Sequence, residues 1–171
     1  MLNRIIILKL FLLLIALSQT ALAKSWREIT PLRSTAQDVA KLSPDCAQAE
    51  TRCQFTIEGH EVMIVFSGSK IGDMECERIP KGTVLAVIIR FSQPKTPREF
   101  QIINRRVQTF DPSSPPNRGY KTYYDVREGL MVNTYKGQVI GVVYVAAQKD
   151  IHLCPEYYAD PKAFVAVGLV P

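Results

Sequence analysis

The sequence predicts an α+β fold: a short N-terminal helix, an antiparallel meander sheet of about six strands, and a short C-terminal helix. Three observations predict it. Apolar and polar residues alternate along several short segments, which is typical of half-buried strands. One longer segment is apolar on both faces, as expected of a central strand. Two segments, one near each end of residues 24–171, have apolar residues at helical spacing together with helix-capping residues.

Residues 1–23 have the pattern of a secretory signal peptide. Basic residues (Arg4, Lys9) accompany an apolar run, and a small-x-small exit ends at Ala23. We therefore expect cleavage after Ala23, and an uncleaved N-terminal anchor is the alternative. The apolar run is short for a membrane span, which needs about 20 apolar residues. The expected product is a single domain over residues 24–171, exported to the periplasm or the extracellular space, with no membrane span.

The first element expected after the signal is a helix over residues 35–42. Ser34, with Gln37 three residues later, has the form of a capping box. Val39 lies on the apolar side of this helix, and Pro44 ends it.

A hairpin and a central strand follow. Apolar and polar residues alternate over 53–58, Gly59-His60 provides a turn, and residues 61–66 return. Residues 83–91 are apolar on both faces and rich in β-branched side chains, which predicts a strand covered on each side.

The middle of the chain is expected to be irregular. Residues 67–80 are a polar loop, residues 93–97 a turn, and residues 99–104 a short element of undecided type. Residues 111–119 are rich in Pro and Ser, which indicates a loop.

The last predicted elements are three strands and a helix. Lys136-Gly137 provides a tight turn between the second and third strands. In the helix, over 160–168, Asp160 is the N-cap and Gly168 the stop. The three strands span residues 120–126, 130–135 and 138–147.

Four cysteines form an even set in a chain with a secretory signal, which predicts two disulfides. Three pairings are open, and one of them joins Cys46 to Cys53 and Cys76 to Cys154. A zinc site is the alternative. However, the spacing contains no C-x-x-C, and few histidines could complete a ligand set. We expect structural cysteines, with no metal and no cofactor.

The charge is mild and scattered. The chain has 21 basic and 16 acidic residues, and the signal holds two of the basic ones (Arg4, Lys9), so the mature domain carries 19 − 16 = +3. A nucleic-acid-binding protein usually shows a concentrated basic face, so we expect no nucleic-acid partner. The glycines form no phosphate-binding motif.

Several segments resemble a family of small exported bacterial proteins of unknown function. An opening of the form W-x-x-I-x-P-L-x-S-T-x-x-D-V spans 26–39, and an ending like D-x-H-L-x-C-P, here one residue shorter (D-I-H-L-C-P), spans 150–155. Further matches lie at Cys53-Gln-Phe55, Cys76, 79–84 and 124–130. The resemblance implies an exported domain without assigned chemistry. In some relatives a comparable module precedes an OmpA-like peptidoglycan-binding region.

The P-L-x-S-T-x-x-D-V part alone is also similar to the helix entry of small lipoproteins of the outer-membrane barrel-assembly type. That family shares a helix-plus-antiparallel-sheet layout with β-lactamase inhibitor proteins. This sequence lacks the lipid-bearing cysteine and the usual glycine before the capping residue, so the likeness implies at most a fold.

Tyrosines provide the candidate binding residues. Aromatic side chains on a sheet face can stack on sugars or anchor a protein partner, and packing within the protein is the alternative. By alternation, Tyr120 and Tyr124 share one face of their strand. The candidate set is Tyr120, Tyr124, Tyr135 and Tyr144.

Asp150 and His152 form the best polar pair, an acid and a base two residues apart. With a serine they could serve a hydrolase, although no G-x-S-x-G elbow is present. The sequence therefore predicts a non-enzymatic binding or interaction module of the bacterial cell envelope, whose partner is an envelope protein or peptidoglycan. An envelope hydrolase using Asp150 and His152 is the alternative.

Overall fold

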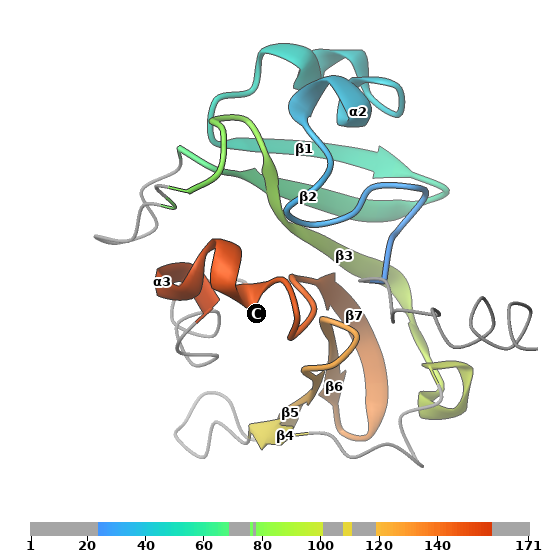
Figure 1. Cartoon of the computed structure of the whole chain (residues 1–171). Helices are drawn as coiled ribbons and strands as arrows, with labels where there is room; N and C mark the ends of the chain where they lie inside the picture. The colour runs from blue at the N-terminus through green and yellow to red at the C-terminus, as the bar shows by residue number, and fades with distance from the viewer. Residues whose placement is uncertain (1–23, 69–75, 77, 101–107, 111–118, 159–171) are drawn as a thin grey trace, which may run out of the picture.

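The computed structural model describes residues 24–68, 76, 78–100, 108–110 and 119–158, and its main feature is one antiparallel sheet (Figure 1). The strand order is β1-β2-β3-β7-β6-β5-β4, so the central pair β3 and β7 joins an N-terminal hairpin to a C-terminal meander. The strands are β1 (Arg52–Ile57), β2 (His60–Phe66), β3 (Val84–Lys95), β4 (Gln108–Phe110), β5 (Tyr120–Asp125), β6 (Leu130–Tyr135) and β7 (Gln138–Tyr144).

The six strands expected from the sequence are present in the expected order, and β4 is an additional edge strand that the sequence did not predict. The described part of the chain is mostly sheet with short helices, which agrees broadly with the α+β class. The helical segments are α2 (Ala36–Ala40), η1 (Pro44–Gln48), η2 (Pro97–Phe100), η4 (Ile151–Leu153) and α3 (Pro155–Tyr158).

The N-terminal helix is shorter than predicted and is capped one residue later. Thr35 is the N-cap, and its N–H and Oγ1 both donate to the Asp38 carboxylate, at 2.9 and 3.1 Å. The predicted capping residue, Ser34, is buried and accepts a hydrogen bond from the Thr30 N–H instead. The prediction of a Ser34/Gln37 capping box was therefore wrong. Asp38, at the third helical position, accepts the hydrogen bond from the Thr35 N–H in place of the expected glutamine.

Two turns differ from the prediction. The first hairpin turns at Glu58-Gly59, both with positive φ (51° and 77°), so His60 already belongs to β2. Strand β3 continues through the predicted turn at 93–97 as far as Lys95, with a register shift against β7 after Arg90. The shift allows Pro94 to lie in a strand without breaking a regular ladder.

Both faces of the sheet are covered by apolar side chains, as predicted for the central strand. On the face that we call the α2 face, Val39 of α2 packs with Val62, Val87 and Val142 of the sheet. The opposite face, the α3 face, is covered by segments that include α3 and the residues just before it. The cluster there includes Leu85, Met131, Val143, Tyr157 and Tyr158.

The central strands approach closely at Gly141 of β7. A Cβ at this position would lie 2.5 Å from the Ile89 carbonyl oxygen of β3. A side chain there would separate the two strands at the middle of the sheet.

Two disulfides cross-link the domain, one between a covering segment and the sheet and the other between two segments outside the strands. Cys46 of η1 is bonded to Cys53 of β1, and Cys76 to Cys154, the residue before α3. The prediction of two structural disulfides is confirmed, and the structure selects one of the three pairings that the sequence left open.

Several predictions lie outside the described residues: the signal peptide, most of the loop at 111–119, part of the element at 99–104, and the helix at 160–168. Among the residues that the structure does describe, no helix is long and apolar enough to cross a membrane.

Candidate binding surface

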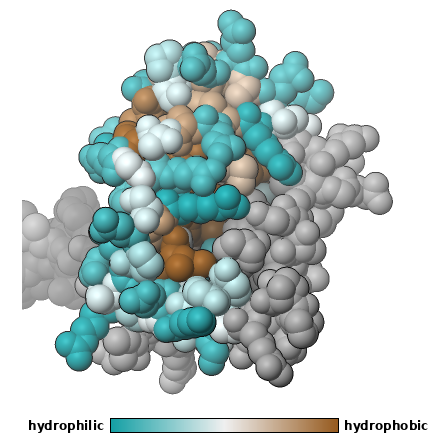
Figure 2. All heavy atoms as spheres, turned by 180° about the vertical axis from the view of Figure 1, so that it is seen from behind, coloured by the Kyte–Doolittle hydropathy of each residue, from teal (hydrophilic) through white to brown (hydrophobic). Residues whose placement is uncertain are grey.

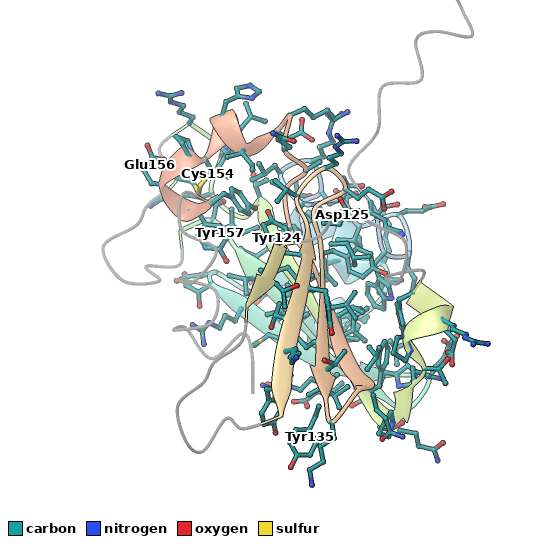
Figure 3. The ribbon with its side chains drawn as sticks, turned by 90° about the horizontal axis from the view of Figure 1, so that it is seen from below. Tyr124, Asp125, Tyr135, Cys154, Glu156 and Tyr157 are labelled. Carbon is teal, nitrogen blue, oxygen red and sulfur yellow. A yellow bond between two sulfur atoms is a disulfide. The ribbon has the colours of Figure 1, made fainter. Side chains whose placement is uncertain are left out.

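The four candidate tyrosines do not share one surface. Tyr120 and Tyr135 pair across β5 and β6, and Tyr124 lies on the same face of β5 but pairs with Met131 further along the ladder. Tyr144 of β7 packs with the α2-face cluster instead. Figure 3 shows Tyr135 at the end of its hairpin, far from Tyr124.

Tyr124 belongs to the core. Only 2% of it is exposed, and it packs in the same cluster as Tyr157 and Tyr158 of α3. Burial raises the pKa of Tyr124 to about 12, and the neighbouring Asp125 charge adds to this shift. Burial also raises the pKa of Tyr157 and Tyr158 above the ordinary value for a phenol. Tyr124 therefore stabilises the fold and presents no contact area to a partner.

The half-buried tyrosines of the meander form a compact aromatic pair. The ring centroids of Tyr120 and Tyr135 lie 4.6 Å apart with an interplanar angle of 34°. The Lys136 ammonium lies 5.1 Å from the centroid of the Tyr135 ring, a cation–π contact. We call Tyr120, Tyr135 and Lys136 the tyrosine pair site.

Backbone geometry positions this site at the end of the sheet. Lys136 (φ 49°) and Gly137 (φ 80°) form the tight turn predicted between β6 and β7. The Lys136 N–H donates to the Gly119 carbonyl at 2.8 Å, which ties the end of the 111–119 segment to the turn. A Cβ at Gly119 would lie 3.5 Å from the Tyr135 ring, so the glycine packs closely on it.

A buried polar pair lies next to the tyrosines on the same face of the sheet. Thr122 Oγ1 donates to Asn133 Oδ1 at 2.9 Å, and both residues are less than 5% exposed. Their side chains face each other because Thr122 and Asn133 are directly paired in the β5–β6 ladder. The sequence analysis missed this pair, since only the strand register brings the two residues together.

Asp150 and His152, the pair of the hydrolase hypothesis, contact different partners and not each other. Arg33 Nη2 donates to Asp150 Oδ1 at 3.2 Å, and Asp150 is 5% exposed. His152 is exposed, and its Nδ1 lies 2.7 Å from the Lys149 carbonyl oxygen. The acid thus neutralises an arginine and the imidazole contacts the backbone, an arrangement without the acid–base contact that a hydrolase triad uses.

Figure 2 shows the molecule from behind, where hydrophilic side chains occupy most of the described surface and apolar ones are visible in the upper part and near the middle. Among the described residues, no group of three His, Cys, Asp or Glu side chains is placed to hold a metal ion.

No family model, curated protein or solved structure matches this chain. The resemblance to small exported proteins therefore stays a prediction from the sequence.

Proposed function

We propose that this protein is an exported, non-enzymatic binding module of the bacterial cell envelope that contacts its partner through the tyrosine pair site. The observation that carries the proposal is the contact between the tilted Tyr120 and Tyr135 rings, with Lys136 beside them. Both rings are half-buried, so they are held in place by the sheet and still offer area to a partner. Rigid aromatic side chains provide contact area at a low cost in conformational entropy.

The two disulfides support the exported location. Disulfides persist in oxidising compartments and are rare in the cytosol. Cys46–Cys53 joins η1 to strand β1, and Cys76–Cys154 joins two segments that are 78 residues apart, so both bonds restrict the unfolded chain. The signal-like residues 1–23 support the same location.

The chemistry of the site supports a partner that combines a flat apolar or sugar face with negative charge. Tyrosine rings stack on such faces, and the lysine attracts a carboxylate. Peptidoglycan carries both features, and so does an envelope protein with an acidic, partly apolar patch. These are the two partners that we propose.

Binding is tested with the purified mature protein, by sedimentation with isolated peptidoglycan and by mild cross-linking in cell envelopes. We expect Tyr135→Ala to abolish capture of the partner and Tyr135→Phe to retain it, because stacking needs the ring and not the hydroxyl. Gln48→Ala is the surface control, since Gln48 is exposed on η1 at the other half of the molecule. Equal capture by wild type and Tyr135→Ala would contradict the proposal.

A further inference from the structure

Strand β1 is a regular edge strand of the described sheet. Among the described strands it pairs only with β2, over six consecutive residues without a register shift (Figure 1). The opposite edge strand, β4, has three residues. Among the described strands, β1 therefore offers the longer edge to another strand.

The outward backbone groups of β1 follow from the hairpin geometry. Ile57 and His60 flank a two-residue turn, so they form a hydrogen-bonded pair, and alternation makes Phe55 and Cys53 the next such pairs with β2. The N–H and C=O groups of Arg52, Gln54 and Thr56 then point away from the sheet. No backbone hydrogen bond within the described part of the chain occupies them.

An apolar row along this edge is only half covered. Phe55 and Ile57 of β1 point to the α2 face and stay half-buried, as does Trp26, whose ring centroid lies 6.4 Å from that of Phe55. A strand added beside β1 would bury more of this row. Natural edge strands usually carry a proline, an inward-pointing charge or a bulge that prevents such pairing. Strand β1 (RCQFTI) has no proline and no bulge, and its one charged residue, Arg52, lies at its start.

We propose that β1 pairs with β1 of a second copy of this chain, as an antiparallel dimer centred on Phe55. In this register, Gln54 of each copy forms a hydrogen-bonded pair with Thr56 of the other, which uses the outward backbone groups. Phe55 lies opposite its own symmetry mate, in the closer type of antiparallel pair. A two-fold symmetric contact of this kind closes on itself and stops at two copies.

The charges of the edge suit this register. Arg52 of each copy lies opposite Glu58 of the other, so the dimer contains two pairs of opposite charge. Both residues are exposed, and the Glu58 side chain remains 69% exposed although it pairs with Arg27 at 2.5 Å. Opposite charges directly across two strands stabilise the pairing, and like charges weaken it.

A charge exchange tests the register. Arg52→Glu places two acidic residues opposite each other, and Glu58→Arg places two basic ones. Each variant alone is expected to weaken the dimer at least about tenfold, because both symmetric contacts become repulsive. An equimolar mixture restores attraction at both contacts, so it should dimerise as wild type does. The measurement is sedimentation velocity of the disulfide-bonded protein over a wide concentration range.

A second variant pair tests the backbone contact. Thr56→Pro removes the outward N–H without affecting the ladder to β2, and proline is tolerated at such an edge position. Thr56→Ala keeps the N–H. We expect Thr56→Pro to be monomeric and Thr56→Ala to dimerise, with matching circular dichroism spectra.

Three results would overturn the inference: a wild type that is monomeric throughout, a mixture that stays monomeric, or a monomer that binds another protein through β1. Tyr135→Ala should leave the dimer intact, because the tyrosine pair site lies on the other half of the sheet. Failure of the dimer and failure of the proposed function are therefore measured separately.

Discussion

Removal of the Cys76–Cys154 disulfide should cost more stability than removal of Cys46–Cys53. The two bonds are well matched, since each joins one fully buried cysteine (Cys46, Cys154) to a half-buried one. They differ in the separation of their cysteines along the chain, 78 residues against 7. A longer loop restricts the unfolded chain more, and the chain-entropy relation gives about 4.5 against about 2.4 kcal/mol at 25 °C.

The comparison uses two double variants, Cys76→Ala with Cys154→Ala and Cys46→Ala with Cys53→Ala. Each replaces one buried and one half-buried thiol, so the losses from packing are similar. Urea unfolding followed by circular dichroism gives the free energy of unfolding by linear extrapolation. We expect the first variant to be less stable than the second by about 2 kcal/mol.

Equal losses, or a larger loss for the short loop, would refute the reasoning. Either result would show that contacts in the folded state, and not the entropy of the unfolded chain, determine what each disulfide contributes.

Four further predictions concern single residues. Gly129→Ala should cost more than about 2 kcal/mol in urea unfolding, because Gly129 has φ 65° and a Cβ there would collide with a facing backbone carbonyl. Asp38→Asn should cost less than about 1 kcal/mol at pH 7, since the carboxylate is partly exposed. This difference should vanish as the pH falls through the pKa of Asp38, which hydrogen bonds from Thr35 hold below 3.8. The pKa of Tyr124 is raised from 10.0 to about 12 in the folded state, so the neutral phenol contributes fully to the free energy of unfolding below pH 10. This contribution is lost as the pH rises from 10 to about 12. Tyr124→Phe has no group to ionise, so its alkaline unfolding, followed by circular dichroism, should occur at higher pH. His152→Ala should leave partner capture and urea stability unchanged, and loss of an envelope hydrolase activity in this variant would favour the alternative function.

The strands were predictable because their alternating pattern is local. Residues 130–135 were assigned with the observed bounds, and the turn at Lys136-Gly137 follows from the glycine, which readily adopts positive φ. The capping residue was not predictable, because Ser34 and Thr35 both suit an N-cap. Which of the two residues caps the helix depends on Thr30, whose N–H donates a hydrogen bond to the Ser34 hydroxyl and holds it away from the helix.

The candidate site was predicted only in part, because the sequence pattern does not show which segments pack on which tyrosine. Alternation placed Tyr120 and Tyr124 on one face correctly, but it carries no information on what covers that face. Tyr157 and Tyr158, about thirty residues further along the chain, pack in the cluster that buries Tyr124. Tyr120 lies beyond this cover and remains half-exposed.

The disulfide connectivity also bears on how the protein matures. Cys46 is bonded to Cys53 and Cys76 to Cys154, so each cysteine is joined to its immediate neighbour in the order of the sequence. A chain that crosses a membrane from its N-terminus presents these four thiols one after another. An oxidase that links cysteines as they emerge then makes both native bonds directly, and the first closes before the second pair is complete. Under the proposed export, maturation of this domain would therefore need oxidation and no reshuffling by a disulfide isomerase.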